Sequence, residues 1–147
     1  MPIRIFYEDT LFKLHSPFKV KSWITSVANL EGFEVGEISY IFCSDYFLLS
    51  LNQEYLDHNT FTDIITFDYS EENSLSGDVF ISMDRVIENA SKFSVAKEQE
   101  TLRVMIHGCL HLIGYKDKSK TEKDQMRETE NRYLSLWKKK FHVKQKR

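Results

Sequence analysis

Two histidines lie four residues apart in an otherwise apolar segment, residues 105–114, which reads Met-Ile-His-Gly-Cys-Leu-His-Leu-Ile-Gly. Residues at positions i and i+4 of an α-helix share one face, with their Cβ atoms roughly 5–6 Å apart. His107 and His111 can therefore direct their imidazoles at a common point, as in the His-x-x-x-His pair of zinc proteins. One histidine on an apolar helix face is typical of a core residue, whereas two at this spacing favour a metal site.

A carboxylate follows the second histidine after an expected reversal of the chain. Gly114 stands where a residue in the left-handed conformation would end the helix. The turn after it can return Asp117 towards the histidines as a third ligand, which leaves the fourth position of a tetrahedral zinc open, as in catalytic sites. An aspartate after a glycine turn can equally cap the next helix, so both roles stay open at this point.

Gly108, directly after the first histidine, limits the chemistry. Zinc peptidases with the motif His-Glu-x-x-His carry their general base at this position, and glycine offers none. Glycine inside a helix also costs roughly 1 kcal/mol relative to alanine. We therefore expect a neighbouring element or the substrate to approach the backbone closely there, and we disfavour a peptidase of that design.

Strands alternate with helices in the first half of the chain, and helices dominate the second half. Residue types and periodicity predict strands at 3–8, 37–44, 62–69 and 76–83, and helices at 13–30, 46–56, 84–94, 96–113 and 121–140. Pro17 suits the first turn of its helix, Asp45 is the expected N-cap of the next, and Ser119 with Glu122 forms a capping box before the last. The pattern indicates an α+β fold, a small mixed sheet of about four strands packed by about five helices.

The composition is that of an ordinary globular protein. The 147 residues suit a single domain, 1–147, and 41% of them are hydrophobic. Cys43 and Cys109 lie in apolar segments and are expected to be buried and reduced. No apolar segment approaches the ~18 residues of a membrane span and no leader pattern is present, so we expect a cytoplasmic protein without membrane contact.

Charge is distributed unevenly along the chain. The formal net charge of −2 gives no global attraction to nucleic acid, so any RNA-binding groove must be local. Residues 138–147 carry six Lys or Arg and no acid, whereas 68–78 carry four acids and no base. The basic tail is typical of a solvated, fraying end, with contact to RNA phosphates as the alternative. Further candidate phosphate-binding cations are Arg85, Lys92, Lys97 and Arg103.

Residues 107–117, His-Gly-Cys-Leu-His-Leu-Ile-Gly-Tyr-Lys-Asp, resemble the signature of the YbeY family of bacterial endoribonucleases, His-Gly-x-Leu-His-Leu-x-Gly-Tyr-Asp-His. Residues 51–67 and 77–82 resemble two further motifs of that family, so the resemblance spans roughly residues 35–135. It implies a zincin-like α+β fold with a zinc ion held by three side chains. It also implies a single-strand-specific endoribonuclease that acts in rRNA processing, notably at the 16S 3′ end, and in ribosome assembly and quality control.

Two positions depart from the family pattern. Where the family has a histidine as third ligand, this chain has Asp117, which predicts a His107–His111–Asp117 site for one Zn²⁺. Two histidines and one carboxylate also bind iron in non-haem enzymes, so another divalent metal is an alternative. Leu56 replaces the arginine of the family motif Leu-Asn-x-x-Tyr-Arg, which lowers activity if that arginine steadies a phosphate in relatives and nothing here compensates.

The expected chemistry is metal-assisted hydrolysis of phosphodiester bonds. The metal would polarise a phosphoryl oxygen or lower the pKa of a water towards ~7, and the 2′-OH of RNA can act as nucleophile without a protein base. Catalytic residues stay unassigned, with Asp63, His58 and Lys116 as candidates. Asp63 falls in the family's Thr-Asp pair and could orient a ligand or a water, or cap a strand.

Two other functions compete with an RNase that binds single-stranded rRNA. One is a non-catalytic ribosome-assembly factor with a structural metal, whose partners are the small subunit or its assembly proteins. The other is a metallohydrolase with a non-RNA substrate. A metal saturated by protein ligands would favour the first, and an open coordination position would favour a catalyst.

Overall fold

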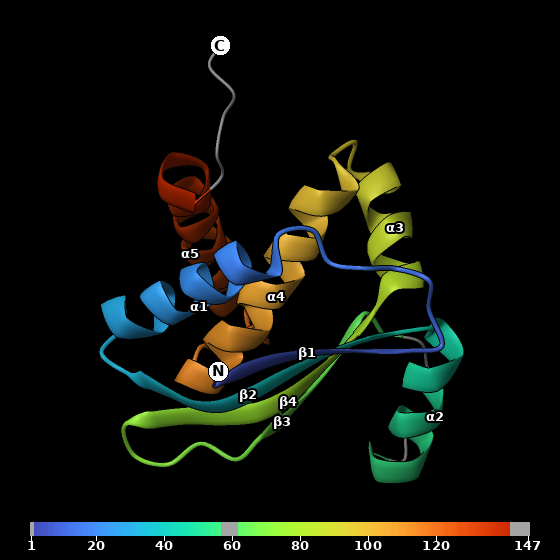
Figure 1. The fold of residues 1–147 in the computed structure, drawn as a ribbon, viewed down its shortest axis with the longest axis horizontal. Helices are drawn as coiled ribbons and strands as arrows, with labels where there is room; N and C mark the ends of the chain where they lie inside the picture. The colour runs from blue at the N-terminus through green and yellow to red at the C-terminus, as the bar shows by residue number, and fades with distance from the viewer. Residues whose placement is uncertain (1, 57–61, 142–147) are drawn as a thin grey trace.

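Four strands and five helices make up the part of the chain that the computed structural model describes, residues 2–56 and 62–141 (Figure 1). In chain order they are β1 (Ile3–Glu8), α1 (Pro17–Leu30), β2 (Glu34–Cys43), α2 (Asp45–Leu56), β3 (Ile64–Asp68), β4 (Ser74–Ser82), α3 (Met83–Lys92), α4 (Lys97–Ile113) and α5 (Lys120–Leu136). A π-helical turn, η1 (Trp137–Phe141), extends α5. The predicted α+β fold is confirmed.

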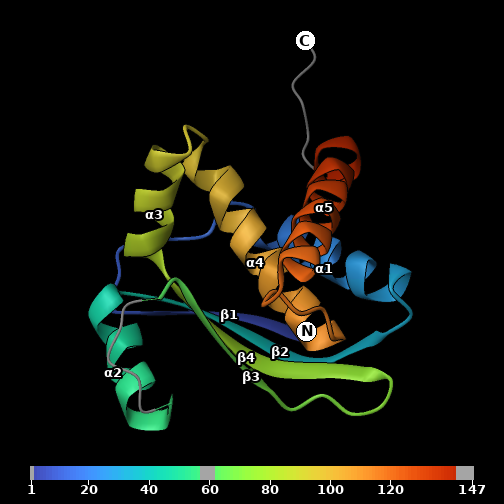
Figure 2. The ribbon, with the colours of Figure 1, turned by 180° about the vertical axis from the view of Figure 1, so that it is seen from behind.

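The strands form one mixed sheet in the order β1-β2-β4-β3. β1, β2 and β4 run parallel, and β3 pairs antiparallel with β4 at the edge. Figures 1 and 2 show α1, α3, α4 and α5 together on one side of this sheet. Side chains alternate between the two faces of a strand, so Val79 and Ile81 join the main core while Phe80 packs with the smaller cluster under α2.

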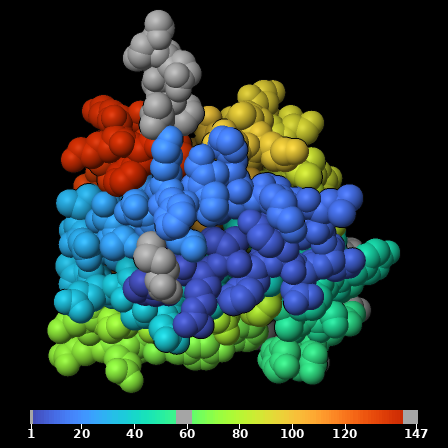
Figure 3. Space-filling view, viewed as in Figure 1, coloured from blue at the N-terminus to red at the C-terminus, as the bar shows by residue number. Residues whose placement is uncertain are grey.

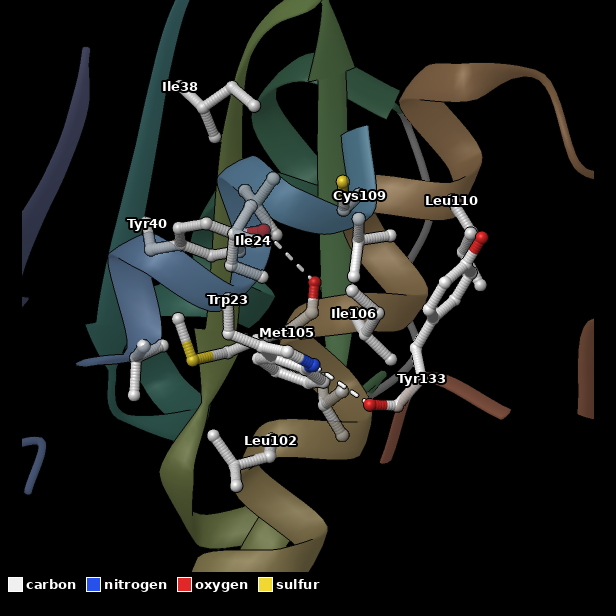
Figure 4. Close-up of a cluster of buried hydrophobic side chains, with 14 of the residues drawn as sticks. Trp23, Ile24, Ile38, Tyr40, Leu102, Met105, Ile106, Cys109, Leu110 and Tyr133 are labelled. Carbon is white, nitrogen blue, oxygen red and sulfur yellow. Dashed lines mark hydrogen bonds between the residues drawn. The ribbon is translucent and has the colours of Figure 1, made fainter. Parts of the chain in front are cut away.

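The main core lies between the sheet and the helices above it (Figure 4). Two buried polar groups are satisfied there by backbone carbonyls. The Trp23 indole N–H donates to the Tyr133 carbonyl at 2.8 Å, and the Tyr40 hydroxyl donates to the Met105 carbonyl at 3.1 Å. These bonds connect α1 to α5 and β2 to α4, so the helix with the two histidines is fixed to the sheet by packing and by specific polar contacts.

Several helix ends differ from the sequence-based predictions by one to four residues, and three of them involve a proline, a cap or a change of helix type. The first helix begins at Pro17 and not at residue 13, because proline occupies the first turn and the preceding residues form a loop. Asp45 is the first residue of α2, and the N-cap is Ser44, whose Oγ accepts a hydrogen bond from the Phe47 N–H at 3.1 Å. The last helix stays α-helical only to Leu136, where the π-helical turn begins.

Both cysteines are free and buried, as predicted. Burial raises the pKa of the Cys43 and Cys109 thiols to about 12, so neither forms a thiolate readily. Cys43 belongs to the cluster under α2 and Cys109 to the main core. Within the described residues, no helix has the length and apolar character needed to cross a membrane.

Candidate metal centre

The C-terminal half of α4 and the turn after it bring three potential ligand atoms together. The Nε2 atoms of His107 and His111 lie 3.0 Å apart. Asp117 Oδ2 lies 3.3 Å from the first of them and 3.6 Å from the second. The two histidines and Asp117 are therefore gathered around one point, as the spacing predicted.

Local chain geometry accounts for the return of Asp117. Gly114 ends α4 with φ +127°, and the N–H groups of Gly114 and Tyr115 donate to the Leu110 carbonyl at 3.0 and 2.9 Å. Ser119 then caps α5 in the predicted capping box, with its Oγ accepting from the Glu122 N–H at 3.1 Å. Because Ser119 holds the N-cap, the alternative that Asp117 caps this helix is wrong.

Each histidine has a hydrogen-bond acceptor at its other ring nitrogen. His107 Nδ1 lies 2.7 Å from Glu130 Oε2, and His111 Nδ1 lies 3.1 Å from the Tyr115 carbonyl oxygen. A carbonyl only accepts, so the His111 Nδ1 carries the proton and its Nε2 presents a lone pair to Asp117. Lone pairs and a carboxylate oxygen this close repel one another unless a proton or a metal cation lies between them, and this donor set fits a divalent metal.

Electrostatics differ between the two imidazoles. Burial, followed by the neighbouring His107, lowers the pKa of His111, so that ring is held neutral. Burial also disfavours the charged form of His107, but the carboxylates of Glu130, Asp117 and Asp63 together outweigh it, so the pKa of His107 is raised. The side chains of His107, His111 and Asp117 are 21%, 29% and 38% exposed, so the group stays open to solvent on one side.

The close approach expected at Gly108 comes from the sheet. A Cβ atom added there would lie 2.8 Å from Val79 Cγ1 and 3.2 Å from Ile64 Cδ1. The glycine therefore lets α4 settle onto β4 and β3, and this fixes the height of the histidines above the sheet. A neighbouring element, not the substrate, fills the space that a side chain would take.

A pocket of about 340 Å³ opens beside His107, between α3, α4 and α5. Figure 2 shows α3 and α5 on either side of α4. On the opposite side of the molecule, the surface is formed largely by β1, the loop after it and α1 (Figure 3). The charged residues lining the pocket are Asp63, Glu100, Arg103, His107, Asp117, Lys123, Arg127 and Glu130.

The family model described as endoribonuclease YbeY matches residues 8–138. The chain belongs to the YbeY endoribonuclease family. An endoribonuclease YbeY from Flavobacterium psychrophilum is 48% identical over 134 residues, which cover 91% of this chain and 93% of the relative. One from Cytophaga hutchinsonii is 46% identical over 135 residues, covering 91% and 94%.

A solved structure supports the same assignment of fold. The solution structure of TM1509 from Thermotoga maritima matches this YbeY-family chain with a TM-score of 0.67 at 27% identity. The match covers 93% of this chain and 90% of that one. The sequence resemblance to the YbeY family is thus confirmed by the family model and by close relatives, and the arrangement of the sheet and helices agrees with a solved structure.

Two of the three catalytic candidates of this YbeY-family chain lie among the described residues, and they lie in different places. Asp63 lines the pocket beside His107, and burial raises the pKa of its carboxyl. Lys116 is exposed and lines a different hollow with Ile113 and Glu122. His58 lies outside the described residues, as does the side chain of Leu56.

Only one of the four named candidate phosphate-binding cations lines this pocket. Arg103 lines the pocket, whereas Arg85 pairs with Asp45 at 3.2 Å and Glu88 at 2.8 Å. Lys97 lines a hollow formed with residues 11–15, and Lys92 lies over the ring of Phe93. The described pocket instead gains Lys123 and Arg127 from α5, which sequence reasoning did not select.

Glu130 is a third residue of the pocket that sequence reasoning missed, and it contacts His107 directly. It is 5% exposed, and it belongs to a buried stripe of α5 whose other members are Met126, Thr129, Tyr133 and Leu134. A carboxylate in the apolar stripe of an amphipathic helix is the signal that could have drawn attention to it. Whether Glu130 contacts His107 or another side chain depends on how α5 packs on α4. No local sequence pattern specifies this packing.

Proposed function

We propose that this YbeY-family chain is a zinc-dependent endoribonuclease that cleaves single-stranded RNA during ribosomal RNA maturation, including that of the 16S 3′ end. The observation that carries the proposal is the group of His107, His111 and Asp117, open on one side and adjacent to a pocket with basic residues. Family membership supports the reaction class.

His107, His111 and Asp117 would hold the metal, each through one atom of the group. When bound, zinc supplies positive charge beside the phosphoryl group and lowers the pKa of a water towards ~7. Among the described residues, only these three form such a group, which leaves an open position, the arrangement of a catalytic and not a structural zinc. The same set suits iron(II), so metal content decides between the two.

Lys123 and Arg127 are the proposed contacts to RNA phosphates. They lie four residues apart on α5, so they share one face of the helix, and both are exposed at the pocket. Arg103 is less available, because its guanidinium is already engaged by Glu130 and Asn131, each at 2.8 Å. Phosphates held by two cations beside the metal group would place a phosphodiester within reach of it.

Asp63 is the catalytic candidate that the pocket supports. Its carboxyl is partly buried beside His107, and its raised pKa favours proton exchange nearer to neutral pH than an exposed aspartate allows. We propose that it orients the 2′-OH or the water that attacks. RNA that provides its own 2′-OH needs no protein base next to the first histidine, in agreement with Gly108.

Metal content and RNA cleavage, measured on the same samples, test the proposal. We expect about one zinc per chain in the wild type and none in Asp117→Ala, as for a three-ligand site that loses one ligand. Asp124→Ala is the matched control, because Asp124 is an exposed aspartate of α5 paired only with Lys120 among described contacts. Wild-type protein purified without chelator and free of metal would contradict the proposed centre.

The substrate is tested with a set of oligonucleotides of one sequence. A single-stranded RNA should be cut, while its duplex and the corresponding DNA should not. A single 2′-deoxy substitution at the cut site blocks cleavage if the 2′-OH is the nucleophile and leaves it intact if water attacks. Metal-loaded protein that cleaves no RNA, yet binds the small ribosomal subunit or its assembly proteins, would favour the assembly-factor alternative.

A further inference from the structure

The contacts of Glu130 differ from those of any other carboxylate in the described pocket. Its Oε2 lies 2.7 Å from His107 Nδ1, and its Oε1 accepts a hydrogen bond from Arg103 Nη1 at 2.8 Å. Arg127 Nη1 lies 3.7 Å from the same Oε1. Each oxygen of this buried carboxylate therefore has its own partner, the arginines on one side and the imidazole on the other.

We propose that Glu130 is a positioning residue that holds the proton of His107 on Nδ1, so that Nε2 is free to bind metal, and that Arg103 determines which Glu130 oxygen is left for this task. The inference rests on the proposed metal centre and adds to it a residue from a helix that supplies no ligand. Partners of this kind fix the tautomer and the ring orientation of ligating histidines.

The imidazole has two neutral tautomers, and only one of them suits a ligand at Nε2. An ionised carboxylate can only accept, so the short contact to Glu130 places the proton on Nδ1. His111 achieves the same result with the backbone carbonyl of Tyr115, four residues further along the chain. His107 has no such local acceptor in the described structure, and it depends on α5.

Arg103 makes the substitution Glu130→Gln informative. A glutamine has one oxygen and one NH₂ group, and a guanidinium can only donate. Arg103, with Arg127 nearby, would attract the amide oxygen, which turns the NH₂ towards His107 Nδ1. That nitrogen would then have to accept, the proton would move to Nε2, and the ligand atom would be blocked.

The experiment compares wild type, Glu130→Gln, Arg103→Met and the double variant by zinc competition with a chelator. Loss of a hydrogen-bond partner of a ligating histidine typically weakens metal binding roughly 10–100-fold, and we expect this for Glu130→Gln. Adding Arg103→Met removes the nearer competing donor and leaves only the more distant Arg127, so the amide oxygen can turn to His107 and a large part of the affinity should be recovered. Glu128→Gln, which removes an exposed carboxylate of the same helix, should bind zinc like the wild type.

The tautomer itself is the second readout, taken on metal-free protein at a pH above the pKa of His107, by long-range ¹H–¹⁵N correlation of the neutral imidazole side chains. The wild type and the double variant should carry the His107 proton on Nδ1, and Glu130→Gln should carry it on Nε2. A purely structural ion pair predicts that the double variant binds zinc no better than Glu130→Gln, and that result would overturn the proposal.

Wild-type protein keeps the test decisive if a variant does not fold. A metal-free wild type with the His107 proton on Nε2 would refute the role of Glu130 without any mutation. If the wild type binds no metal at all, the proposed centre fails, whereas the tautomer measurement still reports on the contact between Glu130 and His107. The two failures are thus distinguishable.

Discussion

Two faces of α4 serve opposite purposes. One face is buried against the sheet and α1, with Leu102, Met105, Ile106, Cys109 and Leu110 at most 3% exposed. The other carries Arg103, His107 and His111 at intervals of four residues, all partly exposed and each held by particular polar atoms. The first face positions the helix through buried area, and the second carries two of the proposed metal ligands.

The two faces should respond differently to substitution. A packed face depends on volume and apolar character, so its substitutions alter the free energy of unfolding in proportion to what they remove. The site face depends on single donor and acceptor atoms. Its substitutions should alter metal content and RNA cleavage while leaving stability almost unchanged, and perturbing each face in turn tests that separation.

The largest effect is expected for His111→Ala on the site face. Removing one of the three proposed ligands should reduce zinc from about one per chain to near zero and RNA cleavage to background, because the metal would supply the Lewis acid. The free energy of unfolding of the metal-free protein should change by less than about 1 kcal/mol. His15→Ala, in the exposed loop before α1, is the matched control and should retain metal and activity. Full metal content in His111→Ala would contradict the assignment of His111 as a ligand.

The second-largest effect is expected for Ile106→Ala on the buried face. Deleting a fully buried isoleucine side chain leaves a cavity and costs about 2–5 kcal/mol in denaturant unfolding. Ile87→Ala removes the same atoms from a side chain that is 46% exposed, and should cost much less. Zinc stoichiometry should stay unchanged in both while they are folded, so loss of metal from folded Ile106→Ala would show that the two faces are not separable.

Gly108→Ala should have a smaller effect on the free energy of unfolding. We expect it to destabilise the protein, although alanine favours a helix more than glycine does. Alanine gains roughly 1 kcal/mol in a helix interior, but its Cβ would lie 2.8 Å from Val79 Cγ1. We expect a net loss of stability of about 1–3 kcal/mol from overpacking. In a double-mutant cycle, Val79→Ala should offset part of this loss, and strictly additive costs would refute the close approach as its cause.

The smallest expected effect is that of Glu100→Gln, a buried carboxylate of the pocket. Burial raises its pKa above 4.5, so the folded state binds more protons than the unfolded state near that pH. The stability it contributes is present below pH 4.5 and is lost as pH rises through the folded-state pKa. Glutamine should therefore increase stability relative to wild type at pH 7 and not at pH 4, as measured by denaturant unfolding.

Glu122→Gln provides the control of opposite sign. Hydrogen bonds from the backbone N–H groups of Ser119 and Lys118 lower the pKa of Glu122, so its contribution is present above pH 4.5 and is lost on acidification. This variant should be less stable than wild type at pH 7, with the difference closing towards acidic pH. If both glutamines shift stability in the same direction with pH, neither assignment holds.

Local patterns in the sequence were sufficient for much of the molecule. Hydrophobic periodicity predicted every strand and helix of the described residues, with errors of a few residues at the ends. Those errors have simple causes: Pro17 starts a helix that periodicity alone extends backwards, and Ser44 takes the cap assigned to Asp45. Gly114 is a short-range signal, and the turn after it made the return of Asp117 to the histidines one of two predicted roles. The match of Asp117 to the third-ligand position of the family pattern favoured that role over a cap of the last helix.

Only the tertiary structure decided which residues surround the two histidines and Asp117. The i, i+4 spacing and the glycine turn act within about a dozen residues, so His107, His111 and Asp117 could be named from the sequence as candidate ligands. Glu130, Lys123 and Arg127 reach the pocket because α5 packs against α4, and Val79 explains Gly108 because β4 lies beneath it. Contacts between segments far apart in the chain depend on how whole surfaces fit together, and no local pattern encodes that fit.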